Sequence, residues 1–121
     1  MKTRTARPLP DFSHIPVEGL KIVGMETISG IKGFGSIQFA RNRYDPYLML
    51  YTDHLAMNVM HPKDKPYGEI ERMILMPRRK PYALRLYFKQ DCRTFSMTIL
   101  NRELLMAVYE FIQGKRKEPA G

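Results

Sequence analysis

The fold is decided by residues 82–112, YALRLYFKQDCRTFSMTILNRELLMAVYEFI. Within residues 82–89, large apolar side chains alternate with a more polar set, which is the period of a β-strand with one buried face. The inward set is Tyr82, Leu84, Leu86 and Phe88, and the outward set is Ala83, Arg85, Tyr87 and Lys89. We therefore expect a half-buried strand over residues 82–89.

The same stretch ends in a change of period. Phe95, Met97 and Ile99 continue the alternation of a strand, after which apolar residues recur at about 3.6 positions, the repeat of an α-helix. The helical stripe consists of Leu104, Leu105, Val108, Phe111 and Ile112. Asn101 is a suitable N-cap and Gly114 a suitable C-cap, so the pattern predicts a helix that ends at residue 114. Residues 115–121 are then expected to form a basic C-terminal tail.

Towards the N-terminus, short extended runs follow one another about every ten residues and are separated by Gly, Pro, Asp and Asn. The expected strands are residues 20–28, 34–41, 47–52, 54–60, 70–76, 82–89 and a seventh that carries Phe95, Met97 and Ile99. Residues 61–66 are expected to form a polar loop. Ile70 and Met73 are three positions apart, which breaks strict alternation and indicates a β-bulge. The sequence therefore predicts an α+β fold that is mostly β, a seven-stranded antiparallel barrel or sandwich capped by one C-terminal helix.

The domain organisation follows from length and from the prolines. A chain of 121 residues can bury one hydrophobic core, so we expect one domain, residues 20–114. Residues 1–19 contain Pro8, Pro10 and Pro16 and show little periodicity, which predicts a flexible N-terminal arm.

Composition narrows the class of protein. The formal net charge of +8 favours anionic partners.

No apolar run approaches the ~20 residues that cross a bilayer, and no signal peptide precedes the domain, so a cytoplasmic location is expected. Cys92 is the single cysteine. We find no nucleophile with a base and no catalytic pair of carboxylates. Asp53 and Asp64 lie near His54 and His61 in the sequence, but these histidines should face opposite ways on a strand and so offer no ligand set for a metal. The chain is therefore predicted to be a binding module without catalytic residues, cofactor or metal.

Two segments resemble a known family. Residues 47–57, YLMLYTDHLAM, resemble the third and fourth strands of bacterial pleckstrin-homology-like and GRAM-type domains, and residues 67–74, YGEIERMI, resemble their fifth strand. The resemblance covers about residues 20–114 and implies a barrel closed at one end by the C-terminal helix. The chain departs from eukaryotic members of the family because it has no tryptophan for that helix.

The first functional hypothesis rests on clustered cations. In eukaryotic members of the family, a phosphoinositide signature places a Lys 7–13 residues before a basic residue, any residue and Arg, and Lys32, Arg41 and Arg43 satisfy it. A second basic group, Arg78, Arg79 and Lys80, is expected at a hairpin tip. Clustered cations bind phosphates and carboxylates by charge-assisted hydrogen bonds. These basic loops predict docking of an acidic protein segment or an anionic lipid headgroup.

The alternative hypothesis is binding of single-stranded nucleic acid. Residues 32–39, KGFGSIQF, match the RNP1 consensus at seven of eight positions if Ile37 is accepted in place of Val; the exception is Ser36, where an aromatic is expected. With Lys32 and Phe34 from this segment, the outward residues Arg85, Tyr87 and Lys89 would supply basic and aromatic groups, which suit a single strand. A third alternative is pairing of an apolar surface with a second copy of the chain, because nine Met residues allow adaptable packing.

Overall fold

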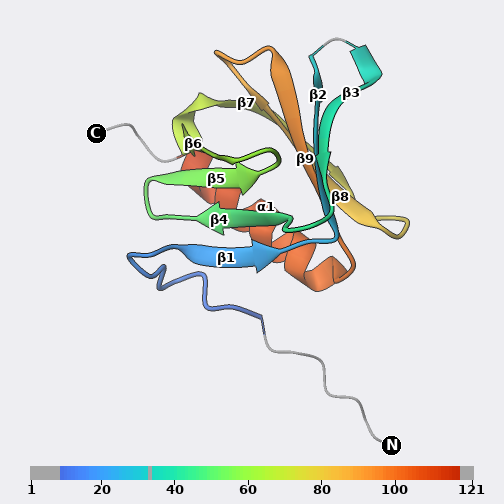
Figure 1. Cartoon of the computed structure of the whole chain (residues 1–121). Helices are drawn as coiled ribbons and strands as arrows, with labels where there is room; N and C mark the ends of the chain where they lie inside the picture. Colours follow the sequence, from blue (N-terminus) through green and yellow to red (C-terminus); the bar gives the residue numbers. More distant parts are fainter. Residues whose placement is uncertain (1–8, 33, 118–121) are drawn as a thin grey trace, which may run out of the picture.

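The protein consists of nine strands, one short 3-10 helix and one α-helix within the part of the chain that the structure, a computed structural model, describes: residues 9–32 and 34–117 (Figure 1). Side chains of residues 34–39 lie outside that description. The elements are β1 (Leu20–Val23), β2 (Glu26–Ile31), β3 (Phe34–Asn42), β4 (Tyr47–Leu50), β5 (His54–Asn58), β6 (Pro62–Pro66), η1 (Tyr67–Glu69), β7 (Ile70–Met76), β8 (Tyr82–Phe88), β9 (Arg93–Ile99) and α1 (Arg102–Lys117).

The strands form two antiparallel sheets. The order is β1-β4-β5-β6 in the four-stranded sheet and β3-β2-β9-β8-β7 in the five-stranded sheet. Figure 1 shows the strands of the smaller sheet running across those of the larger one, with α1 behind β4 and β5. The expectation of a mostly β fold with one C-terminal helix is confirmed. Of the predicted seven-stranded barrel or sandwich, the strand number is wrong and the barrel is not closed, because the described residues form nine strands in two antiparallel sheets.

The strand predicted over residues 20–28 is divided at Gly24, where the chain passes from one sheet to the other. The N–H of Gly24 donates to the Pro46 carbonyl at 3.1 Å, beside the four-stranded sheet. The next N–H, that of Met25, donates to the Thr98 carbonyl at 2.8 Å, beside the five-stranded sheet. A Cβ at Gly24 would lie 2.7 Å from the Thr98 oxygen, so only glycine fits this crossing without displacement.

A second difference is β6, whose residues were predicted to form a loop. β6 begins and ends with proline, Pro62 and Pro66, and pairs with β5 at the edge of the sheet. Proline cannot donate to a sheet ladder and is accepted at such edge positions, which is why the composition was typical of a loop. The bulge predicted near residue 70 is confirmed by a register shift between Ile70 and Arg72.

The helix begins as predicted but ends later. The Asn101 side chain accepts the Leu104 N–H at 3.1 Å, which is the expected N-cap. Gly114 lies inside α1, which continues to Lys117, so the first three residues of the predicted tail are helical. Arg116 donates to the Glu71 carbonyl of β7 at 3.0 Å and so holds this last turn against the sheet.

The core lies between the two sheets and α1. It unites Leu48 and Leu55 of the smaller sheet with Leu84 and Met97 of the larger one and Val108 of the helix. Phe12 packs on this cluster and its ring centre lies 5.7 Å from that of Phe111, so at least this residue of the predicted arm contacts the domain. Residues 1–8 and 118–121 lie outside the described part. No helix of the described residues is long and apolar enough to cross a membrane.

Candidate functional site

The outward face of the five-stranded sheet carries basic and aromatic side chains. Leu84, Leu86 and Phe88 of β8 are fully buried, so the alternation turns Arg85 and Tyr87 to the other face. Pairing places Arg85 between Ser96 of β9 and Ile74 of β7, and Tyr87 between Thr94 and Arg72. The face therefore collects polar groups from three neighbouring strands.

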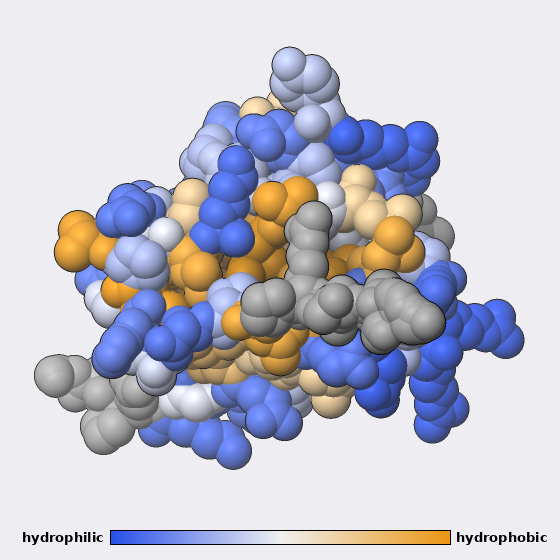
Figure 2. All heavy atoms as spheres, turned by 90° about the horizontal axis from the view of Figure 1, so that it is seen from below, coloured by the Kyte–Doolittle hydropathy of each residue, from blue (hydrophilic) through white to orange (hydrophobic). Residues whose placement is uncertain are grey.

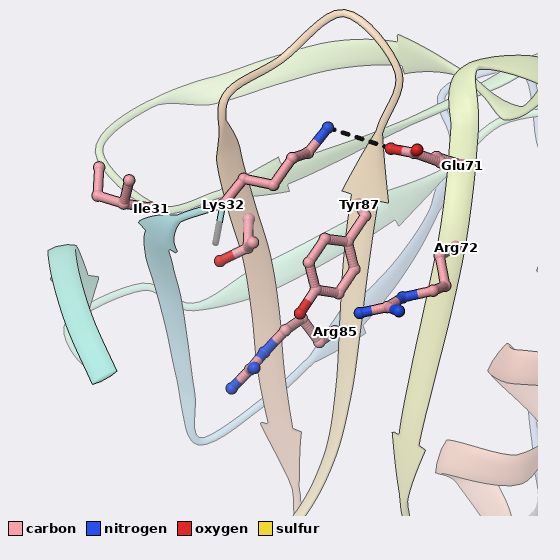
Figure 3. A pocket seen from close by; sticks show the side chains of 7 residues that line it. Ile31, Lys32, Glu71, Arg72, Arg85 and Tyr87 are labelled. Atoms are coloured by element: carbon pink, nitrogen blue, oxygen red, sulfur yellow. Dashed lines mark hydrogen bonds and ion pairs between the residues drawn. The ribbon is translucent and has the colours of Figure 1, made fainter. Parts of the chain in front are cut away.

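These groups line a cavity of about 480 Å³, open to solvent, that we call the outer-face pocket (Figure 3). Its lining residues are Ile31, Lys32, Glu71, Arg72, Arg85, Tyr87 and Thr94. Figure 3 shows the Tyr87 ring between the two arginines, with Arg85 near its hydroxyl and Arg72 reaching in from β7. The Arg72 guanidinium carbon lies 4.6 Å from the ring centre, at the distance of a cation–π contact.

The arginines change the chemistry of the tyrosine. A hydrogen bond from Arg85 is the largest cause that lowers the pKa of Tyr87 below its usual 10, and Arg72 acts in the same direction, while burial opposes them. Arg85 is itself held by a bond from its Nε to the Ser96 hydroxyl at 3.2 Å. The pocket thus presents a polarised phenol between two fixed cations.

Lys32 stands at the rim of the pocket. Its Nζ donates to the Phe88 carbonyl at 2.7 Å and forms an ion pair with Glu71 Oε1 at 3.1 Å. Three cations and one carboxylate therefore line the pocket, which gives it a net positive charge. An anion that displaced Glu71 would find Lys32 already positioned by the Phe88 carbonyl.

The structure brings together three residues of the nucleic-acid hypothesis, Lys32, Arg85 and Tyr87. Lys89 follows the end of β8 and is not among the lining residues; its backbone N–H donates to the Glu69 carbonyl. Phe34 begins β3 opposite Ile31, but its side chain lies outside the described residues.

The three cations of the phosphoinositide signature do not meet. Arg41 and Arg43 both pair with Glu26 Oε2, at 2.8 and 3.0 Å, near the start of β2. Arg41 lies opposite Ile28, and Lys32 is four residues farther along, which is about 13 Å at the rise of a strand. Glu26 also offsets part of their charge. The predicted grouping of Lys32, Arg41 and Arg43 at one loop end is therefore wrong in its geometry.

The basic hairpin tip is where the sequence predicted it. Arg78, Arg79 and Lys80 connect β7 to β8 and are exposed. They line an open cavity of about 680 Å³ together with Leu75 and Met76. No ion pair joins the three cations to another described residue. The tip joins β7 to β8, which lie four and three strands away from β3, so it is about 14–19 Å from the end of β3 by strand spacing, and the two basic groups are separate.

Sequence reasoning missed Arg72 and Thr94. Strict alternation from Ile70, which is buried, would turn Arg72 inward, but the register shift between these residues reverses its direction. Thr94 carried a weak signal, since it lies on the polar side of the alternation that ends at Ile99. Its role appears only once β9 is paired with β8.

Elsewhere, His54 lies between two carboxylates. Its Nδ1 is 2.6 Å from Asp53 Oδ1, and its Nε2 is 3.7 Å from Asp64 Oδ1. Among residues 9–32 and 34–117, no three His, Cys, Asp or Glu side chains form a group that could hold a metal ion.

No protein-family model matches the chain, and comparisons with curated proteins and with solved structures find no match either. Function is therefore inferred from the outer-face pocket and the surfaces around it.

Proposed function

We propose that this chain is a non-catalytic module that binds single-stranded nucleic acid across the outer-face pocket. One observation carries the proposal: Arg72 and Arg85 flank Tyr87 in an open, positively charged hollow on a sheet face. Basic and aromatic groups side by side on such a surface can bind both the backbone and the bases of a single strand.

Each group in the pocket has a distinct use in this proposal. Arg85 and Lys32 lie on either side of the ring and bind phosphate oxygens through charge-assisted hydrogen bonds. Arg72 covers one face of the Tyr87 ring, and a base stacks on the outer face of this Arg72–Tyr87 pair, since both side chains offer flat faces to bases. The net charge of +8 draws the polyanion toward the protein and makes binding weaken with salt.

A second candidate function is supported by the hairpin tip. Arg78, Arg79 and Lys80 are exposed beside the apolar side chains of Leu75 and Met76, a combination that suits an anionic lipid headgroup or an acidic protein segment. The phosphoinositide signature of eukaryotic pleckstrin-homology domains, a family that two segments of the chain resemble, is consistent with such a ligand. In this case the partner is held by a loop and the outer-face pocket is not needed.

Fluorescence anisotropy with a labelled 12-nucleotide single strand tests the first proposal at about 50 and 200 mM salt. Tyr87→Ala should weaken binding roughly 5- to 150-fold, because stacking on an aromatic side chain is worth about 1–3 kcal/mol per base. Arg72→Gln should also weaken binding.

Arg79→Gln is the matched control, because it removes one exposed positive charge from the hairpin tip and leaves the pocket intact. Its effect should be less than about twofold. Equal losses for Arg72→Gln and Arg79→Gln would show that net charge, and not the pocket, governs binding. Binding to phosphatidylserine vesicles that Arg79→Gln weakens and Tyr87→Ala leaves unchanged, with no single-strand binding at low salt, would select the second candidate.

A further inference from the structure

β1 forms one edge of the four-stranded sheet, and the backbone N–H and C=O groups of every second residue face away from the sheet. The Gly24 N–H donates to the Pro46 carbonyl, and Ile22 lies opposite Leu48 in the same ladder. In an antiparallel pair every second residue bonds to the partner strand, so Ile22 bonds to β4 while Lys21 and Val23 point their N–H and C=O groups away from it. In the described part of the chain no strand pairs with this side of β1.

An apolar groove of about 450 Å³ runs beside this edge, between β1 and the first turn of α1. We call it the β1 groove, and the residues that matter here are Leu9, Lys21, Val23, Met25, Leu100 and Leu104. Four of them expose much of their apolar side chains to solvent: Val23 63%, Leu100 54%, Met25 46% and Leu9 45%. Figure 2 shows apolar side chains gathered on the face seen from below, on the side where β1 lies in Figure 1. An open strand edge beside exposed apolar side chains is a template for another strand.

Two other edges are partly blocked against such pairing. β6 begins and ends with proline and carries Lys63 and Lys65 between, the composition that natural sheets use to block an edge. On β7, the Glu71 carbonyl already accepts a bond from Arg116 of α1. β1 contains no proline and a single lysine, Lys21.

We propose that the β1 groove binds an extended segment of a partner protein, which adds to β1 as a fifth strand of this sheet. The segment has alternating apolar residues, which cover Val23 and Leu100, and acidic residues at its ends. β1 spans about 13 Å, so four or five residues of the partner pair with it.

Charge selects this occupant over the alternatives. A second copy paired edge to edge would bring two chains of net charge +8 together and would place two Lys21 side chains near each other. Residues 1–8 carry Lys2, Arg4 and Arg7 and have no apolar alternation that could fill the groove. A strand with acidic ends and alternating apolar residues complements both the positive charge of the protein and the exposed apolar side chains of the β1 groove.

The probe for this proposal is a synthetic peptide, acetyl-Glu-Val-Thr-Val-Thr-Val-Glu-amide, titrated into the full chain labelled with ¹⁵N. Amide shifts should change at residues 20–25 and 100–104, whereas the outer-face pocket should be unaffected. Val23→Pro removes an N–H that points away from β4, so it should leave the native ladder in place and weaken the peptide at least tenfold. Val23→Thr keeps that N–H and is the matched control.

Leu100→Glu provides a second variant that leaves the backbone unchanged. It should also weaken the peptide at least tenfold, because it adds a negative charge to an exposed wall of the groove. Absence of shifts at β1 up to about 1 mM peptide, or equal affinity of Val23→Pro and Val23→Thr, would overturn the proposal. Concentration-dependent dimerisation that Val23→Pro abolishes would also overturn it and would identify a second copy as the occupant.

Discussion

The ion pair between Lys65 of β6 and Asp91 in the β8–β9 turn joins the two sheets, and Asp91→Asn should destabilise the fold by about 3 kcal/mol. Lys65 Nζ and Asp91 Oδ2 are 3.0 Å apart, and their side chains are only 14% and 8% exposed. Burial by itself would raise the pKa of Asp91, but bonds from the Arg93 N–H and from Lys65, with the charges of both residues, lower it to about 2.

The magnitude follows from two contributions that overlap. A pKa lowered from 3.8 to about 2 corresponds to about 2 kcal/mol of stabilisation of the folded state. The substitution also leaves the Lys65 ammonium without its partner, which costs about 3–5 kcal/mol in a fully buried pair and less here because Lys65 keeps some exposure. Since the folded pKa lies below the unfolded one, this stabilisation is complete above about pH 5 and is lost as the pH falls toward 2.

Urea unfolding followed by circular dichroism, at about pH 7 and pH 3, measures both the loss and its pH dependence. The difference between the wild type and Asp91→Asn should shrink by roughly half near pH 3. Asp64→Asn is the control, because it removes a carboxylate from β6 whose side chain is 75% exposed, and it should cost less than about 0.5 kcal/mol. Equal costs for the two substitutions, or a difference that does not change with pH, would refute the role assigned to Asp91.

Two glycine substitutions test the chain crossing and the end of the helix by the same unfolding assay. Gly24→Ala places a Cβ 2.7 Å from the Thr98 oxygen and should destabilise the protein by about 1–3 kcal/mol. Gly68→Ala is the control for this substitution: its Cβ would meet nothing within 4 Å, so stability should change by less than about 0.5 kcal/mol. Gly114→Ala should stabilise the protein by up to about 1 kcal/mol, since this position is inside α1 and has open space around it; a loss of stability would mean that the helix ends there.

The sequence predicted the features of the fold that depend on residues close to one another in the chain. The alternation in residues 82–89 identified the buried face of β8, and Asn101 identified the start of α1, because both depend on neighbours close in sequence. The crossing at Gly24 escaped prediction because its partners, Pro46 and Thr98, are far away along the chain. The end of α1 escaped it for the same reason, since Arg116 bonds to β7.

The candidate site was predictable in its residue types and less so in its grouping. Alternation alone placed Arg85 and Tyr87 on an outward face, but the register of β2, β9 and β8 decides that Lys32 joins them. The same register separates Lys32 from Arg41, which the spacing in the sequence had placed in one signature. Arg72 was missed because the bulge after Ile70 changes the face to which its side chain points, and strict alternation does not include bulges.

Titration of the ¹⁵N-labelled chain with an unlabelled single-stranded decanucleotide at low salt tests most directly whether the outer-face pocket is the binding site. We expect amide shifts centred on Lys32, Arg72, Thr94 and residues 85–87, with smaller changes at the hairpin tip. Shifts confined to residues 77–81, or no shifts on the outward face of the five-stranded sheet, would contradict the proposal.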